Sequence, residues 1–155
     1  MEGLSDFRRL SWLWAYCYDQ KDFVKLESIC SSVDFKMYYG DLDPRLGGDK
    51  IVPVQDYVAE MSSQTALGDS HLKTQHFLGS VMFEQEDEDT VVGNWQVQGL
   101  HQRTLADGTV ALWNAYNYVK HYYRRDAEGI WKLDGLKPSR PLFMDGRPQD
   151  VIGHF

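Results

Sequence analysis

The sequence predicts an α+β fold, with helices in the first half of the chain and strands in the second. Apolar residues at three- and four-residue spacing indicate a helix from Leu4 to about Asp19, and Asp22 and Pro53 mark the starts of two shorter helices. After Gly68 the pattern changes to long strands separated by turn residues. A run of helices followed by a run of strands is typical of the α+β class.

The individual elements follow from local pattern. Ser5 and Asp6 can cap the first helix, which has one aromatic face. A short strand is expected over 35–39, followed by a loop rich in glycine and aspartate over 40–49. Four long strands are then expected, at about 72–84, 90–104, 109–123 and 130–137. Such a long, twisted sheet curls around the helices and leaves a cavity that suits an apolar ligand.

The length of the chain fits a single domain. One hydrophobic core accommodates 155 residues, and no repeat or linker interrupts the sequence, so we expect one domain over 1–155. The segment 139–155 contains two prolines, which prevent a long regular element. It is expected to be a tail or a lid over the cavity mouth, with Phe143 and Phe155 as candidate lid residues.

Composition argues against several kinds of partner. A net charge of −7 gives little electrostatic support for binding nucleic acid or an anionic membrane. The first residues do not resemble a secretory signal, and no apolar run reaches the length of a membrane helix. Cys17 and Cys30 are too few for a disulfide framework, so reduced thiols and an intracellular, cytoplasmic location are expected.

Two histidines are the strongest candidates for proton transfer. Period-two alternation places His76 on one strand face with Leu72, Thr74 and Leu78, and places His101 on a face with Trp95 and Val97. An imidazole can both accept and donate a proton near neutral pH. A purely structural role for both histidines remains the alternative.

Other chemistries find less support in the sequence. No metal-ligand spacing such as His-x-His is present, so we expect no metal. A Gly-x-Ser-x-Gly elbow and glycine-rich phosphate loops are also missing. The expected partner is therefore a small-molecule substrate.

Tyrosine and aspartate side chains could complete such a site. Tyr18 and Asp19 close the first helix, and Tyr38 lies in the first strand. A tyrosine hydroxyl can donate to a substrate carbonyl, directly or through water, and an aspartate can orient an imidazole. Tyr18 as a core residue and Asp19 as a surface residue is the alternative.

The chain resembles the scytalone dehydratase family from about Leu13 to Pro138. The resemblance rests on four blocks, namely AYCYDQKDF at 15–23, LGD with LKTQHFLG at 67–79, HQR at 101–103 and GIWKLDGLKP at 129–138. It implies a cone-shaped α+β barrel like that of nuclear transport factor 2, with a curved, mixed, mostly antiparallel sheet wrapped around the N-terminal helices. It also implies a homotrimer assembled through the sheet.

The resemblance implies an enzyme that eliminates water from a cyclic, polyketide-derived hydroxyketone without metal or cofactor. It implies that Tyr18 and Tyr38 hold a water molecule against the carbonyl and that His76 transfers the proton. It also implies that the second histidine, His101, is paired with Asp19. Where the family has a serine and an asparagine, this chain has Asn117 and Val119. Losing a polar contact changes which hydroxyl pattern the pocket accepts.

The set of expected substrate contacts comprises Asn117, Val119, Trp14 and Phe143. The two replacements keep a second enzymatic hypothesis open, in which an isomerase or cyclase rearranges a reactive enolate or quinone methide. A binding or assembly protein with structural histidines is a third hypothesis.

Overall fold

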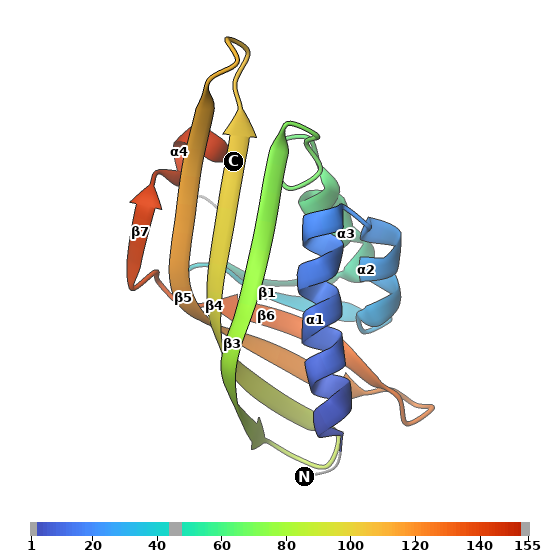
Figure 1. The fold of residues 1–155 in the computed structure, drawn as a ribbon. Coiled ribbons are helices and arrows are strands. Elements are labelled where there is room, and N and C mark those ends of the chain that lie inside the picture. The colour runs from blue at the N-terminus through green and yellow to red at the C-terminus, as the bar shows by residue number, and fades with distance from the viewer. Residues whose placement is uncertain (1–2, 44–47, 153–155) are drawn as a thin grey trace.

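A strongly curved sheet with helices packed against its inner side forms most of the structure (Figure 1). The computed structural model describes residues 3–43 and 48–152. The helices are α1 (Leu4–Gln20), α2 (Phe23–Ile29), α3 (Val54–Ser62) and α4 (Pro148–Val151). The strands are β1 (Asp34–Tyr38), β2 (Asp49–Pro53), β3 (Leu72–Gln85), β4 (Thr90–Thr104), β5 (Val110–Arg125), β6 (Trp131–Pro138) and β7 (Phe143–Gly146). The predicted α+β class is confirmed.

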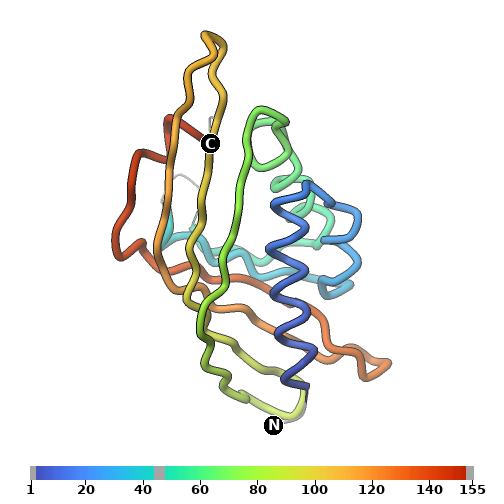
Figure 2. The backbone as a smooth tube through the Cα atoms, in the orientation of Figure 1, coloured from blue at the N-terminus to red at the C-terminus, as the bar shows by residue number. Residues whose placement is uncertain are grey.

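The sheet is mixed but mostly antiparallel. Its strand order is β2-β1-β6-β5-β4-β3, with β7 paired separately to β5. The β1–β6 pair is parallel and the other pairs are antiparallel. The sheet does not close into the expected barrel, because β2 and β3 are its two ends. Instead, α1 runs beside β3 along the open edge (Figures 1 and 2).

The four long strands lie within two residues of their predicted bounds, because their hydrophobic alternation is long and regular. Three short elements were missed. The strand β2 occupies a stretch whose start was expected to be a loop, and β7 and α4 lie in the tail. Each has four or five residues, which is too short for a recognisable period.

An aromatic core anchors α1 on the sheet. Phe7 is fully buried, and its ring packs edge-on to Trp131 and tilted against Phe83 and Tyr123, with centroids 4.8 to 5.5 Å apart. Burying a side chain of this size contributes roughly 1.5–3 kcal/mol. This packing fixes α1 along β3 and so sets the position of the residues at its C-terminal end.

None of the helices in the described part of the chain combines the length and the apolar character needed to cross a membrane.

Candidate active site

A cavity of about 130 Å³ lies between α1 and the inside of the sheet. Its wall is almost wholly apolar, and among the described residues it contains four titratable side chains: Tyr18, Tyr39, His76 and His101. A larger hollow of about 550 Å³ adjoins it and shares Leu42, Trp113 and Ile152 with it. The arrangement gives an apolar chamber, a few convergent polar groups and a route to the surface.

The two imidazoles meet because of the register between β3 and β4. His76 pairs with Gly99 and His101 pairs with Thr74, so the histidines are diagonal neighbours on the inner face. Their ring centroids are 5.5 Å apart, and the rings are nearly perpendicular. A Cβ atom at Gly99 would lie 3.1 Å from Cε1 of His101 and 3.7 Å from Cδ2 of His76. Gly99 therefore makes room for the pair, a contribution that the sequence analysis missed.

Asp19 orients His76 rather than His101, which corrects the expected pairing. The carboxylate Oδ1 accepts a hydrogen bond from Nδ1 of His76 at 2.8 Å, and Oδ2 accepts one from its backbone N–H at 2.9 Å. Thr74 donates its hydroxyl to Oδ1 at 2.9 Å. Asp19 lies in the last turn of α1, beside the start of β3, which explains the choice. Because a carboxylate only accepts, Nδ1 of His76 carries the proton and Nε2 is the basic nitrogen.

His101 is held as a neutral imidazole. Its Nδ1–H donates to the carbonyl of Trp113 at 3.0 Å, and its ring stacks on the Trp113 ring at 4.3 Å. Burial, with a smaller contribution from the neighbouring His76, lowers the pKa of His101 to about 3. His101 can therefore accept a hydrogen bond through Nε2, whereas His76, next to a carboxylate, is the imidazole suited to carry charge.

Tyr39, not Tyr38, supplies the second tyrosine of the cavity. Phe35 and Met37 are inward-facing residues of β1, and continuing that alternation brings Tyr39 inside and turns Tyr38 outward. Tyr38 instead packs edge-on to Tyr122 at 5.8 Å, so its expected place in the chamber is wrong. The alternation of buried residues could have revealed the correct choice.

Both cavity tyrosines remain protonated at neutral pH. Burial raises the pKa of Tyr18 to about 12, and it raises the pKa of Tyr39 well above its ordinary value. A phenol that keeps its proton can donate a hydrogen bond to an oxygen on which negative charge develops. Tyr18 also lies next to His76, with ring centroids 5.6 Å apart.

The expected substrate contacts divide into two groups. Trp14 and Val119 line the cavity, whereas Asn117 is buried but turns its amide toward the backbone carbonyl of Ser139, to which it donates at 3.2 Å. Phe143 is 61% exposed and stacks on Tyr116, which belongs to the outer face of β5. The prediction that Phe143 forms a lid is therefore wrong, and Phe155 lies outside the described residues.

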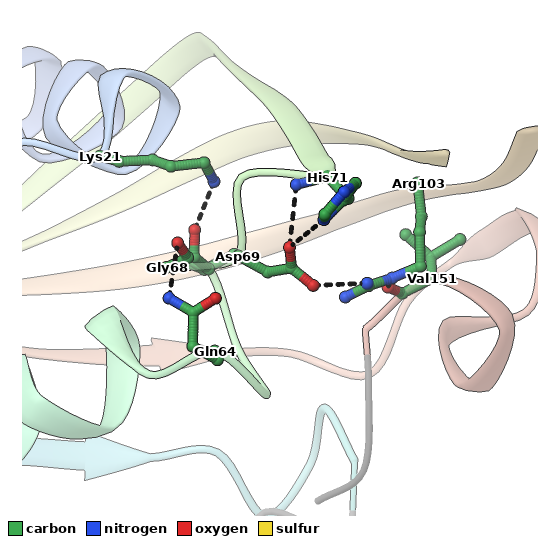
Figure 3. A network of polar contacts seen from close by, with 8 residues as sticks. Lys21, Gln64, Gly68, Asp69, His71, Arg103 and Val151 are labelled. Carbon is green, nitrogen blue, oxygen red and sulfur yellow. Dashed lines mark hydrogen bonds and ion pairs between the residues drawn. The ribbon is translucent and has the colours of Figure 1, made fainter. Parts of the chain in front are cut away.

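Within the described part of the tail, residues 139–152, Ile152 just after α4 lines the cavity. Figure 3 shows the polar network that holds this segment. Arg103 of β4 donates Nε to the carbonyl of Val151, and its Nη1 lies 2.6 Å from Asp69. Hydrogen bonds from the backbone of His71 and, with a smaller effect, from the side chain of Arg103 lower the pKa of Asp69 to about 2.

The same network reaches α1 (Figure 3). Lys21, which ends α1 in the left-handed backbone conformation, donates its ammonium group to the carbonyl of Leu67, a cavity residue. The end of α1, the 63–71 turn, β4 and the C-terminal segment are thereby linked around the cavity.

The remaining described histidines lie elsewhere. His121 is fully buried, accepts or donates one hydrogen bond with Ser11 at 2.7 Å, and has its pKa lowered to about 3 by burial. His71 is on the surface beside Asp69. Within residues 3–43 and 48–152, no group of three or more His, Cys, Asp or Glu side chains is placed to hold a metal ion.

Known proteins resemble this chain in sequence and in overall fold. The family model described as scytalone dehydratase matches residues 3–142. Scytalone dehydratase of Pyricularia oryzae is 33% identical over 148 residues, covering 86% of this chain and 82% of that protein. The crystal structure of Kfla4162 from Kribbella flavida has a TM-score of 0.73 at 19% identity and covers 91% of each chain.

The fold has a further solved relative. A nuclear transport factor 2-like superfamily protein of Salmonella enterica has a TM-score of 0.68 at 12% identity, covering 90% of this chain and 91% of that one. This likeness shows the fold alone.

Proposed function

Because this chain belongs to the scytalone dehydratase family, we propose that it is a cofactor-independent dehydratase which eliminates water from a cyclic, polyketide-derived hydroxyketone. Membership of the family supports a dehydratase or a related activity. One observation carries the finer proposal: the Asp19-bound imidazole of His76 lies in an apolar chamber with the neutral His101 and two phenols.

In the proposed reaction, Nε2 of His76 removes a proton from the carbon next to the substrate carbonyl. The electron pair of that C–H bond moves toward the carbonyl, and negative charge develops on its oxygen. Tyr18 and Tyr39 donate to this oxygen, directly or through a water molecule. Asp19 stabilises the positive charge that His76 acquires, through the 2.8 Å hydrogen bond to Nδ1.

The second half of the reaction returns the same proton. Protonated His76 donates from Nε2 to the leaving hydroxyl group, the C–O bond breaks, and water departs as the enolate electrons form the new double bond. His76 ends neutral, so the step balances without an added reagent. The neutral His101 accepts a hydrogen bond from a substrate hydroxyl and so holds the leaving group near His76.

The cavity favours a flat, sparsely substituted ring. Val119, Val97 and Leu136 line it, and none offers a hydrogen bond. A substrate hydroxyl left unpaired against this wall would cost roughly 1–3 kcal/mol. We therefore propose that polar substituents face either the four titratable side chains or the adjoining hollow.

The test compares wild type with His76→Ala on a panel of cyclic hydroxyketones by mass spectrometry. Wild type should release a product 18 Da lighter, and the variant should be slower by about 10²–10⁴-fold. His71→Ala, a surface histidine outside the cavity lining, is the matched control and should retain full activity. Equal turnover by wild type and His76→Ala would refute the proposed role, and no turnover on any ketone would favour a binding protein.

A second candidate is an isomerase or cyclase in the same cavity. It is favoured by Val119, which lines the cavity where the family resemblance expects an asparagine and so offers the substrate no hydrogen bond. If protonated His76 returned its proton to carbon rather than to a leaving hydroxyl, the product would keep the mass of the substrate. Product mass in the same assay separates the two reactions.

We also propose that the protein acts in the cytoplasm, and that it forms a homotrimer through the outer face of the sheet. Phe77, Tyr116, Tyr118 and Leu142 line one shallow hollow on that face, which supports burial against another copy of the chain. Light scattering after size exclusion should give three times the chain mass of 18.0 kDa, and a monomer would refute the trimer.

A further inference from the structure

A third tyrosine lies behind the cavity wall. Tyr57 of α3 is fully buried, and its ring stacks on Phe35 of β1 with centroids 3.8 Å apart and an interplanar angle of 11°. This stacking leaves the ring little freedom, because it is held between the helix and the strand. The position of its hydroxyl group is thereby fixed.

That hydroxyl group faces Tyr18. The two hydroxyl oxygen atoms are 2.6 Å apart. Within the described residues, Tyr18 is the hydrogen-bond partner of the Tyr57 hydroxyl. If Tyr57 accepted this bond, its own buried proton would have no acceptor in that part of the chain, which is unfavourable. Tyr57 therefore donates to Tyr18, and the proton of Tyr18 is left to point elsewhere.

The remaining direction for that proton is toward the cavity, where the hydroxyl group of Tyr39, a second hydrogen-bonding neighbour of Tyr18, also lies. Tyr18 and Tyr39 line the cavity, whereas Tyr57 does not line it. A hydroxyl that accepts one hydrogen bond becomes a stronger donor of its own, because the two bonds polarise each other. Consistent with this, the hydrogen bond from Tyr57 lowers the pKa of Tyr18, partly offsetting the larger rise caused by burial.

We propose that Tyr57 is a positioning residue, whose hydroxyl group donates to Tyr18 and so directs the Tyr18 proton at a carbonyl oxygen bound in the cavity. The carbonyl rests on the proposed function; the hydrogen bond and the direction of the proton do not. Tyr57 touches neither substrate nor reacting atoms in this assignment.

The kinetic test is Tyr57→Phe, which keeps the ring and its stacking on Phe35 but removes the hydroxyl. The expected result is a kcat lower by about 3- to 10-fold with KM nearly unchanged, because the lost hydrogen bond acts on the charge that develops during reaction. Tyr123→Phe is the matched control. Tyr123 is equally deep and bonds to Ser11 and Trp95, but it does not line the cavity.

Thermal unfolding of both variants excludes a trivial cause. Tyr123→Phe removes two hydrogen bonds and Tyr57→Phe removes one, so Tm should fall at least as far in Tyr123→Phe, while kcat should fall in Tyr57→Phe alone. An unchanged kcat in Tyr57→Phe, or an equal fall in Tyr123→Phe, would overturn the proposal.

A second measurement does not need turnover. 2-Tetralone, a bicyclic ketone without a leaving hydroxyl, is bound to each protein, and its carbonyl stretch is recorded by infrared difference spectroscopy. The frequency should be lowest in wild type, higher in Tyr57→Phe and highest in Tyr18→Phe, because weaker donors polarise the carbonyl less.

The two measurements separate the two proposals. If wild type dehydrates no ketone but the frequency order holds, the dehydratase proposal fails and the role of Tyr57 stands. If wild type turns over but Tyr57→Phe matches it in frequency and kcat, the role of Tyr57 fails alone. Failure of 2-tetralone to bind wild type would count against a carbonyl-directed role.

Discussion

Replacing Asp19 with asparagine should slow turnover strongly while leaving the fold intact. Asp19 makes three hydrogen bonds, to Nδ1 and the backbone N–H of His76 and to Thr74. The contact with Nδ1 is 2.8 Å long, and both side chains are at most 15% exposed. At this depth a charge-assisted hydrogen bond contributes about 1.5–3 kcal/mol.

The direct attraction of opposite charges about 4 Å apart is of order 4 kcal/mol at an effective dielectric constant of about 20. Removing the carboxylate charge should therefore raise the barrier by about 2–4 kcal/mol, which lowers kcat by roughly 30- to 1000-fold. Thr74→Val removes a single hydroxyl from the same carboxylate and should cost only about 2- to 10-fold.

The assay is steady-state dehydration of the best ketone from the panel, with Asp134→Asn as the control. Asp134 is also buried and bonds to Lys36 and Arg124, but it does not line the cavity. A full kcat in Asp19→Asn, or a loss no larger than that of Thr74→Val, would refute the idea that Asp19 stabilises charge on His76.

Three further results are expected. Tyr39→Phe should lower kcat by at least about 10-fold, while Tyr38→Phe should change it less than about 2-fold. The reverse order would show that Tyr38 and not Tyr39 acts on the substrate carbonyl. Arg103→Met should raise KM by about 3- to 10-fold and speed proteolysis of the C-terminal segment, because Val151 loses its anchor; unchanged KM and proteolysis would contradict the anchoring role. The free energy of unfolding should level off above about pH 7.5 and fall as pH decreases through 6.5 toward 3, because His101 and His121 bind protons in the unfolded chain but have pKa values of about 3 in the fold. The unfolding free energy should change by about 1.4 kcal/mol per pH unit for each histidine. In urea titrations, His121→Asn should remove the contribution of one histidine to this slope. An unfolding free energy that does not change with pH would contradict the low pKa values of the two histidines.

Long strands with regular hydrophobic alternation could be predicted from the sequence, whereas the pairing of side chains from different elements could not. The strands carrying His76 and His101 alternate over many residues, so both the strands and their inner faces were predicted correctly. The partner of Asp19 depends on where the end of α1 lies along β3, which tertiary packing decides. No local pattern contains that information.

The tyrosine error has a different physical origin. In a strand, a shift of one residue moves a side chain to the opposite face. Tyr38 and Tyr39 are adjacent, so residue type could not separate them, whereas the buried positions Phe35 and Met37 do. The misplacement of Phe143 follows from missing β7, which pairs with β5 and carries Phe143 to the outside of the sheet.

The packing of α1 against β3 controls how far Tyr18 and Asp19 lie from the sheet histidines. Tyr18 and Asp19 share the last turn of this helix, so their mutual spacing is set by the helix, but their placement against the sheet histidines depends on packing along β3. Substitutions on the buried face of α1, for example at Phe7 or Leu10, would slide the phenol and the carboxylate together as one rigid unit. Selection could in this way adjust reactivity from positions that never contact a substrate.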